Sequence, residues 1–361
     1  MKKTLLSVAF ASLFASSSVV SMTLEERLAA MEQRINQLEQ RVASQDQVIQ
    51  EKEAQIEQLQ ENQPETAEAE SGGWFQSIEM GGVVEINADQ IKTDGAGTSS
   101  DLYVATAEID ISAQVNDWTT ADLVLLYEDG DNGINVDTAT VTIADPNSIW
   151  SLTAGKTVVP FGVYETFMLA DPLTLTLGET TEDTLIFGLE DHGFNGGIYV
   201  YKDDINANDN AEVGSYGSWL GYSRKTAAMN YSVTLGYTNN LANADGFEDF
   251  VATSQNPEVD ALQARIGLNI EHFSFLAEYV GAMDDFEPGQ LSDDGNSNTT
   301  RQSPSAYQIE AAYHFNIVEK DTTFAIGYGE TDEAQFVGLG EKRFLSSLSL
   351  GVLKNTTVTL E

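Results

Sequence analysis

The sequence contains no cysteine, which excludes disulfide bonds, thiolate metal sites and a thiol nucleophile. Positive charge is scarce, because 17 lysines and arginines stand against 57 aspartates and glutamates, for a formal net charge of −40. Such acidity argues strongly against nucleic acid as a partner. Beyond the N-terminus no run approaches the roughly 20 apolar residues that a spanning helix needs, so any membrane insertion must use strands.

The first 21 residues have the pattern of a secretory signal peptide. Lys2 and Lys3 precede an apolar stretch from Leu5 to Phe14, and small residues follow from Ala15 to Ser21. This order predicts cleavage after Ser21 and export from a bacterial cytoplasm. A short buried helix is the alternative interpretation.

Residues 22–60 carry a heptad pattern that predicts an α-helical coiled coil. The pattern alone leaves dimer and trimer open, because the polar Gln45 and Lys52 interrupt one seam, and analogy with porins favours three helices. Residues 61–73 are acidic, contain Pro64 and Gly72-Gly73, and predict a flexible linker. The seam positions are Leu24, Leu28, Met31, Ile35, Leu38, Val42, Ile49, Ile56 and Leu59.

From residue 74 to residue 361 apolar and polar residues alternate. In the segment from Tyr103 to Val115 the odd positions are apolar and the even ones mostly polar or acidic. A strand turns these two sets to opposite faces, which suits a barrel with lipid outside and water inside. A soluble sandwich is the alternative, but it gives no reason for tight links to alternate with long loops along the chain, as they do here.

We place fifteen strands, the first at 75–89 and the last beginning at 356. The expected fold is therefore all-β, a transmembrane antiparallel β-barrel. Single-chain bacterial barrels have even strand numbers, and the final residues Thr359-Leu360-Glu361 are not a terminal aromatic signal. We therefore expect a sixteen-stranded barrel whose last part is missing from this sequence.

Strand parity predicts which charged side chains line the lumen. Carboxylates there would concentrate cations and oppose anions, although any polar lumen would serve hydration equally well. His314 and Arg265 are the scarce basic exceptions. The predicted pore-lining residues are Glu79, Glu85, Glu108, Asp110, Asp122, Glu128, Arg265, Glu278 and Glu310.

The connection after the fifth strand, 158–182, is long and mixes large apolar residues with carboxylates. As the third long loop by count, it is expected to fold inward and narrow the pore, with its apolar residues on the wall. An apolar subunit contact is the alternative. The predicted constriction residues are Phe161, Tyr164, Glu165, Asp171, Glu179 and Glu182.

No arrangement of residues points to an enzyme, and the sequence predicts no cofactor or metal site. Two of the three histidines, His192 and His272, fall in expected tight turns. Glycine pairs such as Gly81-Gly82 lack the strand, loop and helix context of a phosphate-binding loop.

One passage resembles a known family. The segment from Leu152 to Thr166 reads LTAGKTVVPFGVYET and is similar to the "AGK…PFG…ET" passage of the LbtU-type siderophore porins. The signal peptide, the coiled coil and the barrel opening at Trp74 fit the same family. This resemblance implies a passive outer-membrane channel that imports ferric siderophores without a plug domain.

The expected location is the bacterial outer membrane, with the coiled coil in the periplasm. The expected partners are outer-membrane lipid and lipopolysaccharide, two further copies in a homotrimer, and a ferric siderophore as transported solute. A structural tether that links the barrel to peptidoglycan through the coiled coil is the alternative function.

Overall fold

The computed structural model describes residues 75–361, except for 94–96, 131, 204–211, 248–249, 253–256 and 294–295. The predicted signal peptide, coiled coil and linker lie outside the described residues. Within them, no helix is long and apolar enough to cross a membrane.

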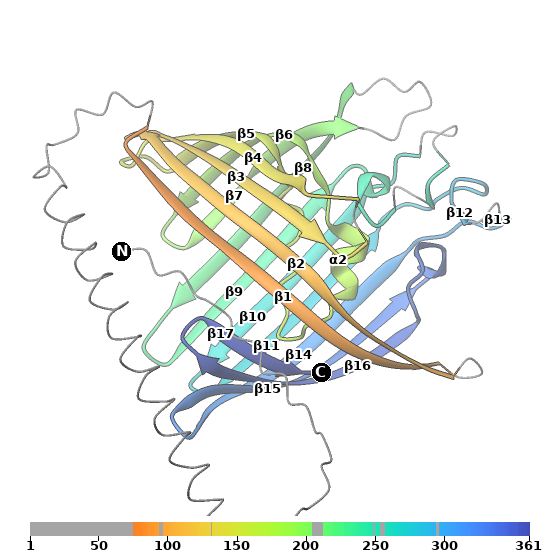
Figure 1. The fold of residues 1–361 in the computed structure, drawn as a ribbon. Coiled ribbons are helices and arrows are strands. Elements are labelled where there is room, and N and C mark those ends of the chain that lie inside the picture. Colours follow the sequence, from red (N-terminus) through yellow and green to blue (C-terminus); the bar gives the residue numbers. More distant parts are fainter. Residues whose placement is uncertain are drawn as a thin grey trace, which may run out of the picture. The chain divides into compact units, whose positions relative to one another are not determined.

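One antiparallel sheet of fifteen strands accounts for most of the described chain (Figure 1). A two-stranded ribbon, the six-residue helix α2 (Leu173–Gly178), and the 3-10 turns η1 (Leu241–Asn243) and η4 (Gln335–Val337) lie in its connections. The strands of the main sheet are β1 (Ser77–Thr93), β2 (Gly97–Asn116), β3 (Thr119–Glu128), β4 (Asn135–Ala144), β5 (Trp150–Val158), β6 (Thr181–Asp191), β7 (Phe194–Asp203), β8 (Glu212–Lys225), β9 (Met229–Thr238), β10 (Ala261–Ile270), β11 (Phe273–Ala282), β14 (Ser305–Ile317), β15 (Lys320–Asp332), β16 (Lys342–Leu353) and β17 (Thr356–Leu360), while β12 (Ser292–Asp293) and β13 (Asn296–Ser297) form the ribbon.

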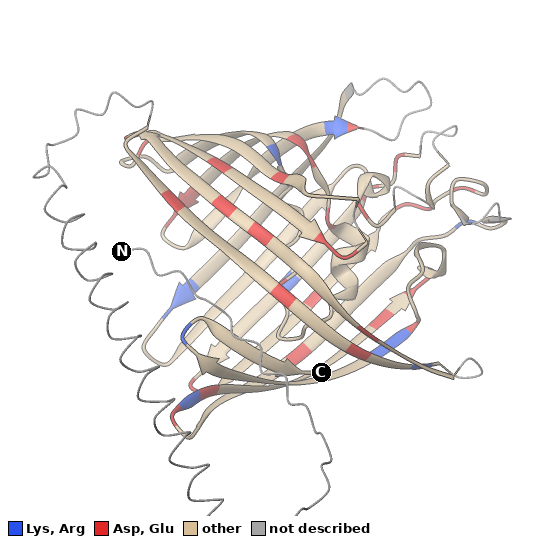
Figure 2. Cartoon of the chain, viewed as in Figure 1, with Lys and Arg blue, Asp and Glu red and all other residues tan. Residues whose placement is uncertain are grey.

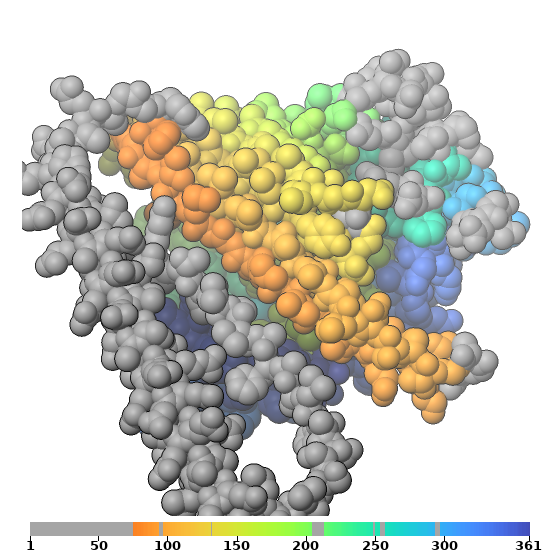
Figure 3. Space-filling model, in the orientation of Figure 1, coloured from red at the N-terminus to blue at the C-terminus, as the bar shows by residue number. Residues whose placement is uncertain are grey.

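Within the main sheet each strand pairs with the next one along the chain, and β11 pairs with β14 because β12 and β13 form the separate ribbon. This confirms the all-β antiparallel fold and the fifteen predicted strands. On the face in view in Figure 3, β1 and the strands that follow it form a continuous wall. In the described part of the chain β1 and β17 are the two edges of the sheet and do not pair with each other, so a sixteenth strand and a closed barrel stay predictions.

Short turns lie at one end of the strands, and the long connections lie at the other, although the link between β1 and β2 at that end is only three residues long. The short turns include 117–118, 192–193, 271–272 and 354–355, whereas 159–180, 239–260 and 283–304 are long. In the tight turn between β14 and β15, Val318 and Glu319 have φ of 49° and 60°. Both residues are thus in the left-handed region that a type I′ hairpin turn requires.

The two faces of the sheet differ in chemistry. The outer face exposes apolar side chains such as Ile198, Leu220 and Ile266, which a lipid environment would cover. Aromatic rings also lie near both ends of the outer face. Tyr328 packs on Phe344 near the long loops, and further pairs near the short turns include Phe194 with Tyr222 and Phe273 with Tyr313.

A β-bulge changes the parity of β2 in a way the alternation did not predict. The register passes from Glu85 opposite Thr106 to Ile86 opposite Val104, so β2 holds one extra residue there. Tyr103 was predicted on the outer face, but its hydroxyl donates to Asp89 Oδ2 at 2.7 Å on the inner face. The extra residue is the physical reason, since side chains on its N-terminal side, Tyr103 among them, face opposite to what the alternation after it predicts.

Candidate functional site

The inner face of the sheet holds the connection between β5 and β6, residues 159–180, as predicted for the third long loop. Its helix α2 packs on β11, β14 and β15, and Figure 1 shows it within the curve of the sheet. Pro172 precedes the helix with φ of −65°, a value that suits the start of a helix. Leu173 and Leu177, four residues apart, put one apolar side of the helix against the wall.

The apolar residues of the loop are buried within this chain. Phe161 is 1% exposed and Tyr164 7%, and both pack in a core cluster that includes Tyr199 and Val280. Further along, Met168 packs on the small side chains of β14 and β15. Packing against the wall therefore accounts for the large apolar residues of this loop.

Glycines let the loop approach the wall and turn. A Cβ on Gly236 of β9 would overlap the backbone carbonyl of Phe161, and one on Gly162 would overlap the ring of Tyr164. Gly162 belongs to the PFG part of the passage that resembles the siderophore porins. A side chain on Gly236 would therefore push the loop away from the wall, and one on Gly162 would displace the Tyr164 ring within the loop.

Glu278 on β11 is the first of two buried carboxylates that hold the loop. Its Oε1 accepts from the backbone N–H groups of Val163 and Tyr164, at 3.3 and 3.4 Å. The same oxygen accepts from Gln263 Nε2 at 2.8 Å, and Oε2 accepts from Thr174 Oγ1 at 3.0 Å. Several donors are what a buried carboxylate requires, because burial of an unpaired charge is costly.

Glu310 on β14 is the second buried carboxylate that holds the loop. Its Oε1 accepts from Thr166 Oγ1 at 2.6 Å and its Oε2 from the backbone N–H of Phe167 at 2.6 Å, while Gln308 Nε2 donates as well. Both carboxylates face inward, as strand parity predicted, but they are only 4% and 1% exposed. The loop covers them, so they lie beneath it rather than on an open lumen surface.

Three further contacts fix the exposed side of the loop. Arg265 on β10 forms an ion pair with Glu165, whose side chain is 70% exposed. On β16, Arg343 donates to the backbone carbonyl of Asp171. The Glu361 carboxylate accepts from the N–H groups of residues 169 and 170, at 2.7 and 3.1 Å. Predicted pore-lining and constriction residues thus meet here as bonded partners.

The wall made by β1, β2 and β3 carries the other six predicted pore-lining carboxylates. Cross-strand pairing puts Glu79 opposite Ser112, which donates to Asp122 at 2.6 Å. Asp110 and Glu108 lie opposite residues 81 and 83 of β1, so inward carboxylates recur about every 7 Å along the strand.

Higher on the same wall, Glu85 and Glu128 each pair with Thr106. Figure 2 shows these acidic bands along β1 and β2. Lys92, at the end of β1, is the only lysine or arginine in these three strands. This wall is therefore acidic along its length.

Three carboxyl groups near the long connections, Asp171, Glu179 and Asp245, have pKa values raised by desolvation. Asp245 accepts from the N–H and Oγ1 of Thr181, at 3.0 and 2.9 Å, and its own N–H donates to the carbonyl of Glu179. Burial, helped by the nearby charge of Asp245, raises the pKa of Glu179 to about 7. Partial desolvation also raises the pKa of Asp171, which is exposed, against the opposing effect of Arg343. Glu182, at the start of β6, is buried.

Four functional residues were not among the predicted ones. Gln263 and Gln308 face inward by parity, so alternation could have found them, but a prediction based on charge overlooks neutral side chains. Arg343 also follows parity, whereas no sequence signal marks Asp245. Within the described residues, no group of three or more His, Cys, Asp or Glu side chains could hold a metal ion.

Comparison with known proteins places the fold. No family model matches the chain. Among solved structures it is similar to an anion-selective porin from Comamonas acidovorans, with a TM-score of 0.52 and 14% identity, covering 78% of this chain and 86% of that one. It is also similar to the outer membrane channel DcaP of Acinetobacter baumannii, with a TM-score of 0.54 and 11% identity, covering 78% and 88%. This chain has the fold of the outer-membrane porins.

Relatives by sequence carry no functional name. The "UPF0422 protein lpg2959" of Legionella pneumophila is 25% identical over 293 residues, which are 73% of this chain and 54% of that protein. A "UPF0422 protein" of Coxiella burnetii is 26% identical over 301 residues, or 79% and 63%. This chain thus spans less than two thirds of the length of either relative. The porin part of the expected resemblance is supported, and the siderophore subfamily stays a prediction.

We predict that Glu310→Gln loosens the loop. The amide nitrogen of glutamine cannot accept a hydrogen bond, so either Thr166 or Phe167 loses its partner, at a cost of about 1–3 kcal/mol. Single-channel recordings should show more frequent current fluctuations, and protease should cut within 159–180 faster. Glu79→Gln makes the same chemical change on the opposite wall and is the control. Equally quiet currents and equal protease resistance in both variants would refute the anchoring role.

The raised pKa of Glu179 predicts a pH dependence. This group is neutral well below pH 7 and charged above it, so cation preference should increase as pH rises through about 7. Because the folded pKa lies above the ordinary glutamate value of 4.5, its contribution to folding stability is present below about 4.5 and is lost as pH rises to about 7. Reversal potentials at pH 5 and 8.5 measure the first effect. Glu179→Gln should abolish it, and an undiminished shift in that variant would contradict the assignment.

Proposed function

We propose that this chain forms an outer-membrane diffusion channel that passes cations in preference to anions. The observation that carries the proposal is the acidic wall of β1, β2 and β3, in which Lys92 is the only basic residue. On the inserted loop the carboxylate of Glu165 is exposed but is paired with Arg265, so the negative charge of the lumen comes mainly from this wall. The porin fold supplies the pathway, and the loop supplies the constriction.

The electrostatics of a lumen explain the expected preference. Carboxylates held about 7 Å apart along a strand give overlapping negative potentials, because the Debye length is about 10 Å at 0.1 M salt. Low-dielectric walls strengthen that potential within the pore, which raises the local concentration of cations. The anion preference in the name of the Comamonas porin belongs to that protein and does not transfer through a shared fold.

The solute we propose is a ferric siderophore or a similar small molecule. The support is the LTAGKTVVPFGVYET passage. With the inserted loop as its constriction, the channel would carry solutes by diffusion. The acidic lumen restricts the choice, since anionic iron complexes would be repelled. Neutral or cationic complexes fit better. Uptake of labelled ferric siderophores by cells with and without the gene tests this part of the proposal.

We further propose that the protein is a trimer of the outer membrane, with residues 22–60 forming a periplasmic coiled coil. The heptad seam supports self-association, and the apolar outer face supports membrane insertion. A tether to peptidoglycan is the second candidate function, favoured by the same heptads. Deletion of residues 22–73 separates the two, because a channel would keep its conductance whereas a tether would lose envelope integrity.

Cation selectivity gives the direct test of the channel. In planar bilayers with a salt gradient, the reversal potential should indicate cation preference, and the triple variant Glu79→Gln, Glu108→Gln, Asp110→Asn should weaken it by about half or more. Neutralising the proposed constriction carboxylates Glu165, Asp171, Glu179 and Glu182 should also weaken selectivity with little change in conductance. Shortening the loop should instead raise conductance, because it removes the constriction itself.

The control is Asp284→Asn with Asp285→Asn, in the long connection between β11 and β14. These residues lie outside the constriction, and exposed charges are screened over a Debye length. If the control shifts the reversal potential as much as the loop variants do, the constriction is not where we place it. Anion preference in the unmodified protein would overturn the proposed function.

A further inference from the structure

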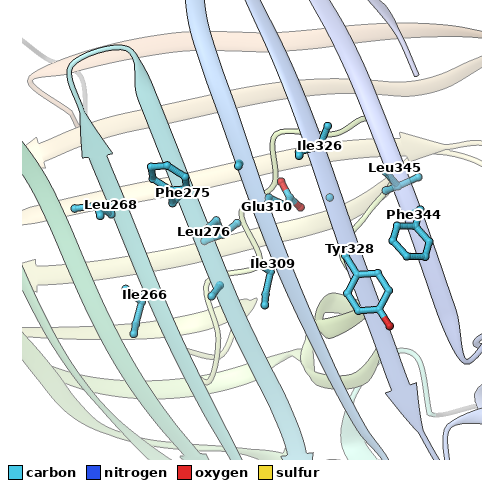
Figure 4. Close-up of a pocket in the computed structure, with 13 residues that line it drawn as sticks. Ile266, Leu268, Phe275, Leu276, Ile309, Glu310, Ile326, Tyr328, Phe344 and Leu345 are labelled. Carbon is cyan, nitrogen blue, oxygen red and sulfur yellow. The ribbon is translucent and has the colours of Figure 1, made fainter.

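The outer face of β10, β11, β14, β15 and β16 is not evenly covered by side chains. It contains an apolar hollow of about 650 Å³ (Figure 4). Its cause lies in the sequence, because Ala277 and Ala311 are small residues at outward positions. The register puts Ala277 opposite Ile309, and Ala311 opposite Phe275 and Ile326. Two short side chains on a diagonal thus leave a depression between bulky neighbours.

A polar group of side chains lies directly above this hollow, toward the long loops. Glu330 Oε2 accepts from the hydroxyl of Tyr307 at 2.9 Å and also from the hydroxyl of Tyr328. The ammonium group of Lys342 lies 4.0 Å from the other carboxylate oxygen, and its side chain is 59% exposed. The ring of Tyr328 lines the hollow, so this residue joins the apolar and polar parts.

Along the strands, from the long loops downward, these groups follow the order of headgroup and acyl chain in a lipid. Glu330 and Lys342 lie opposite each other on β15 and β16. One pair of opposite residues separates them from the next outward pair below, Tyr328 and Phe344. From Glu330 down to the outward Phe324 is six residues, or about 20 Å, close to the roughly 25 Å apolar band of a membrane barrel. A charged and hydroxyl-bearing upper end above an apolar hollow matches a lipid headgroup above an acyl chain.

We propose that this hollow holds an acyl chain of lipopolysaccharide, with a phosphate of its lipid A head on Lys342. The proposal rests on the outer-membrane location proposed above, because the long-loop end then faces the leaflet that contains lipopolysaccharide. A second copy of the chain fits the site less well. It would bury Glu330 and Lys342, and burying an ion pair carries a desolvation cost that an exposed pair avoids.

The test uses protein purified from outer membranes in detergent, stripped of lipid and titrated with lipid A bearing two Kdo sugars. Native mass spectrometry measures the bound fraction. Ala311→Phe fills the hollow and should raise the apparent Kd about tenfold or more, equivalent to about 1.4 kcal/mol. Lys342→Gln should weaken binding about fivefold and remove most of its salt dependence. Ala154→Phe, an exposed alanine on β5 away from the hollow, is the matched control and should bind as the unmodified protein does.

Bilayer conductance and selectivity of Ala311→Phe should be unchanged, so failure of the lipid site is distinguishable from failure of the channel. If Ala311→Phe does not fold, the smaller change Ala277→Leu serves in its place. Unaltered lipid A binding in the hollow variants would overturn the proposal. So would equal affinity for phosphatidylglycerol, or a loss of oligomers in Ala311→Phe without a loss of lipid.

Discussion

The inner side of the sheet is organised by two buried carboxylates, Glu278 and Glu310, that accept hydrogen bonds from the inserted loop. Each projects from the wall and is covered by the segment it holds. A carboxylate in this setting is stable only while its donors are in place, because an unpaired buried charge is costly. The loop and the wall are therefore mutually dependent, and the apolar packing of Phe161, Tyr164 and Leu177 reinforces the same position.

This arrangement divides the charges of the inner face into two kinds. On the loop side carboxylates are used to bind the loop, and basic residues such as Arg265 and Arg343 are also bonded to it. On the wall of β1, β2 and β3, carboxylates recur on the inner face, whereas Lys92, the single basic residue of these strands, lies near the end of β1. The acidic excess of the sequence thus has two structural roles, and the second is the one that supports a cation preference.

Much of the fold could be predicted from sequence. Alternation with period two located all fifteen strands, and the segregation of short and long connections gave the topology. The inserted loop was predictable because residues such as Phe161 and Tyr164 need a wall. Parity failed at Tyr103, where a bulge with no sequence mark shifts β2. Parity also could not show that the loop covers Glu278 and Glu310. Their hydrogen bonds with loop N–H groups depend on the path of a segment that is distant in the sequence.

The central claim is that residues 159–180 lie against the inner face of β9, β10, β11, β14, β15 and β16, and a cross-link measures this most directly. Ser347 Oγ donates to the carbonyl of Phe167 at 3.2 Å, so the two positions are adjacent. Because the chain has no cysteine, the pair Phe167→Cys and Ser347→Cys can be bridged by a short bifunctional thiol reagent without background. We expect efficient bridging within one chain and a conductance unchanged by it. Absence of bridging, or a conductance altered on bridging, would contradict the inserted position of the loop.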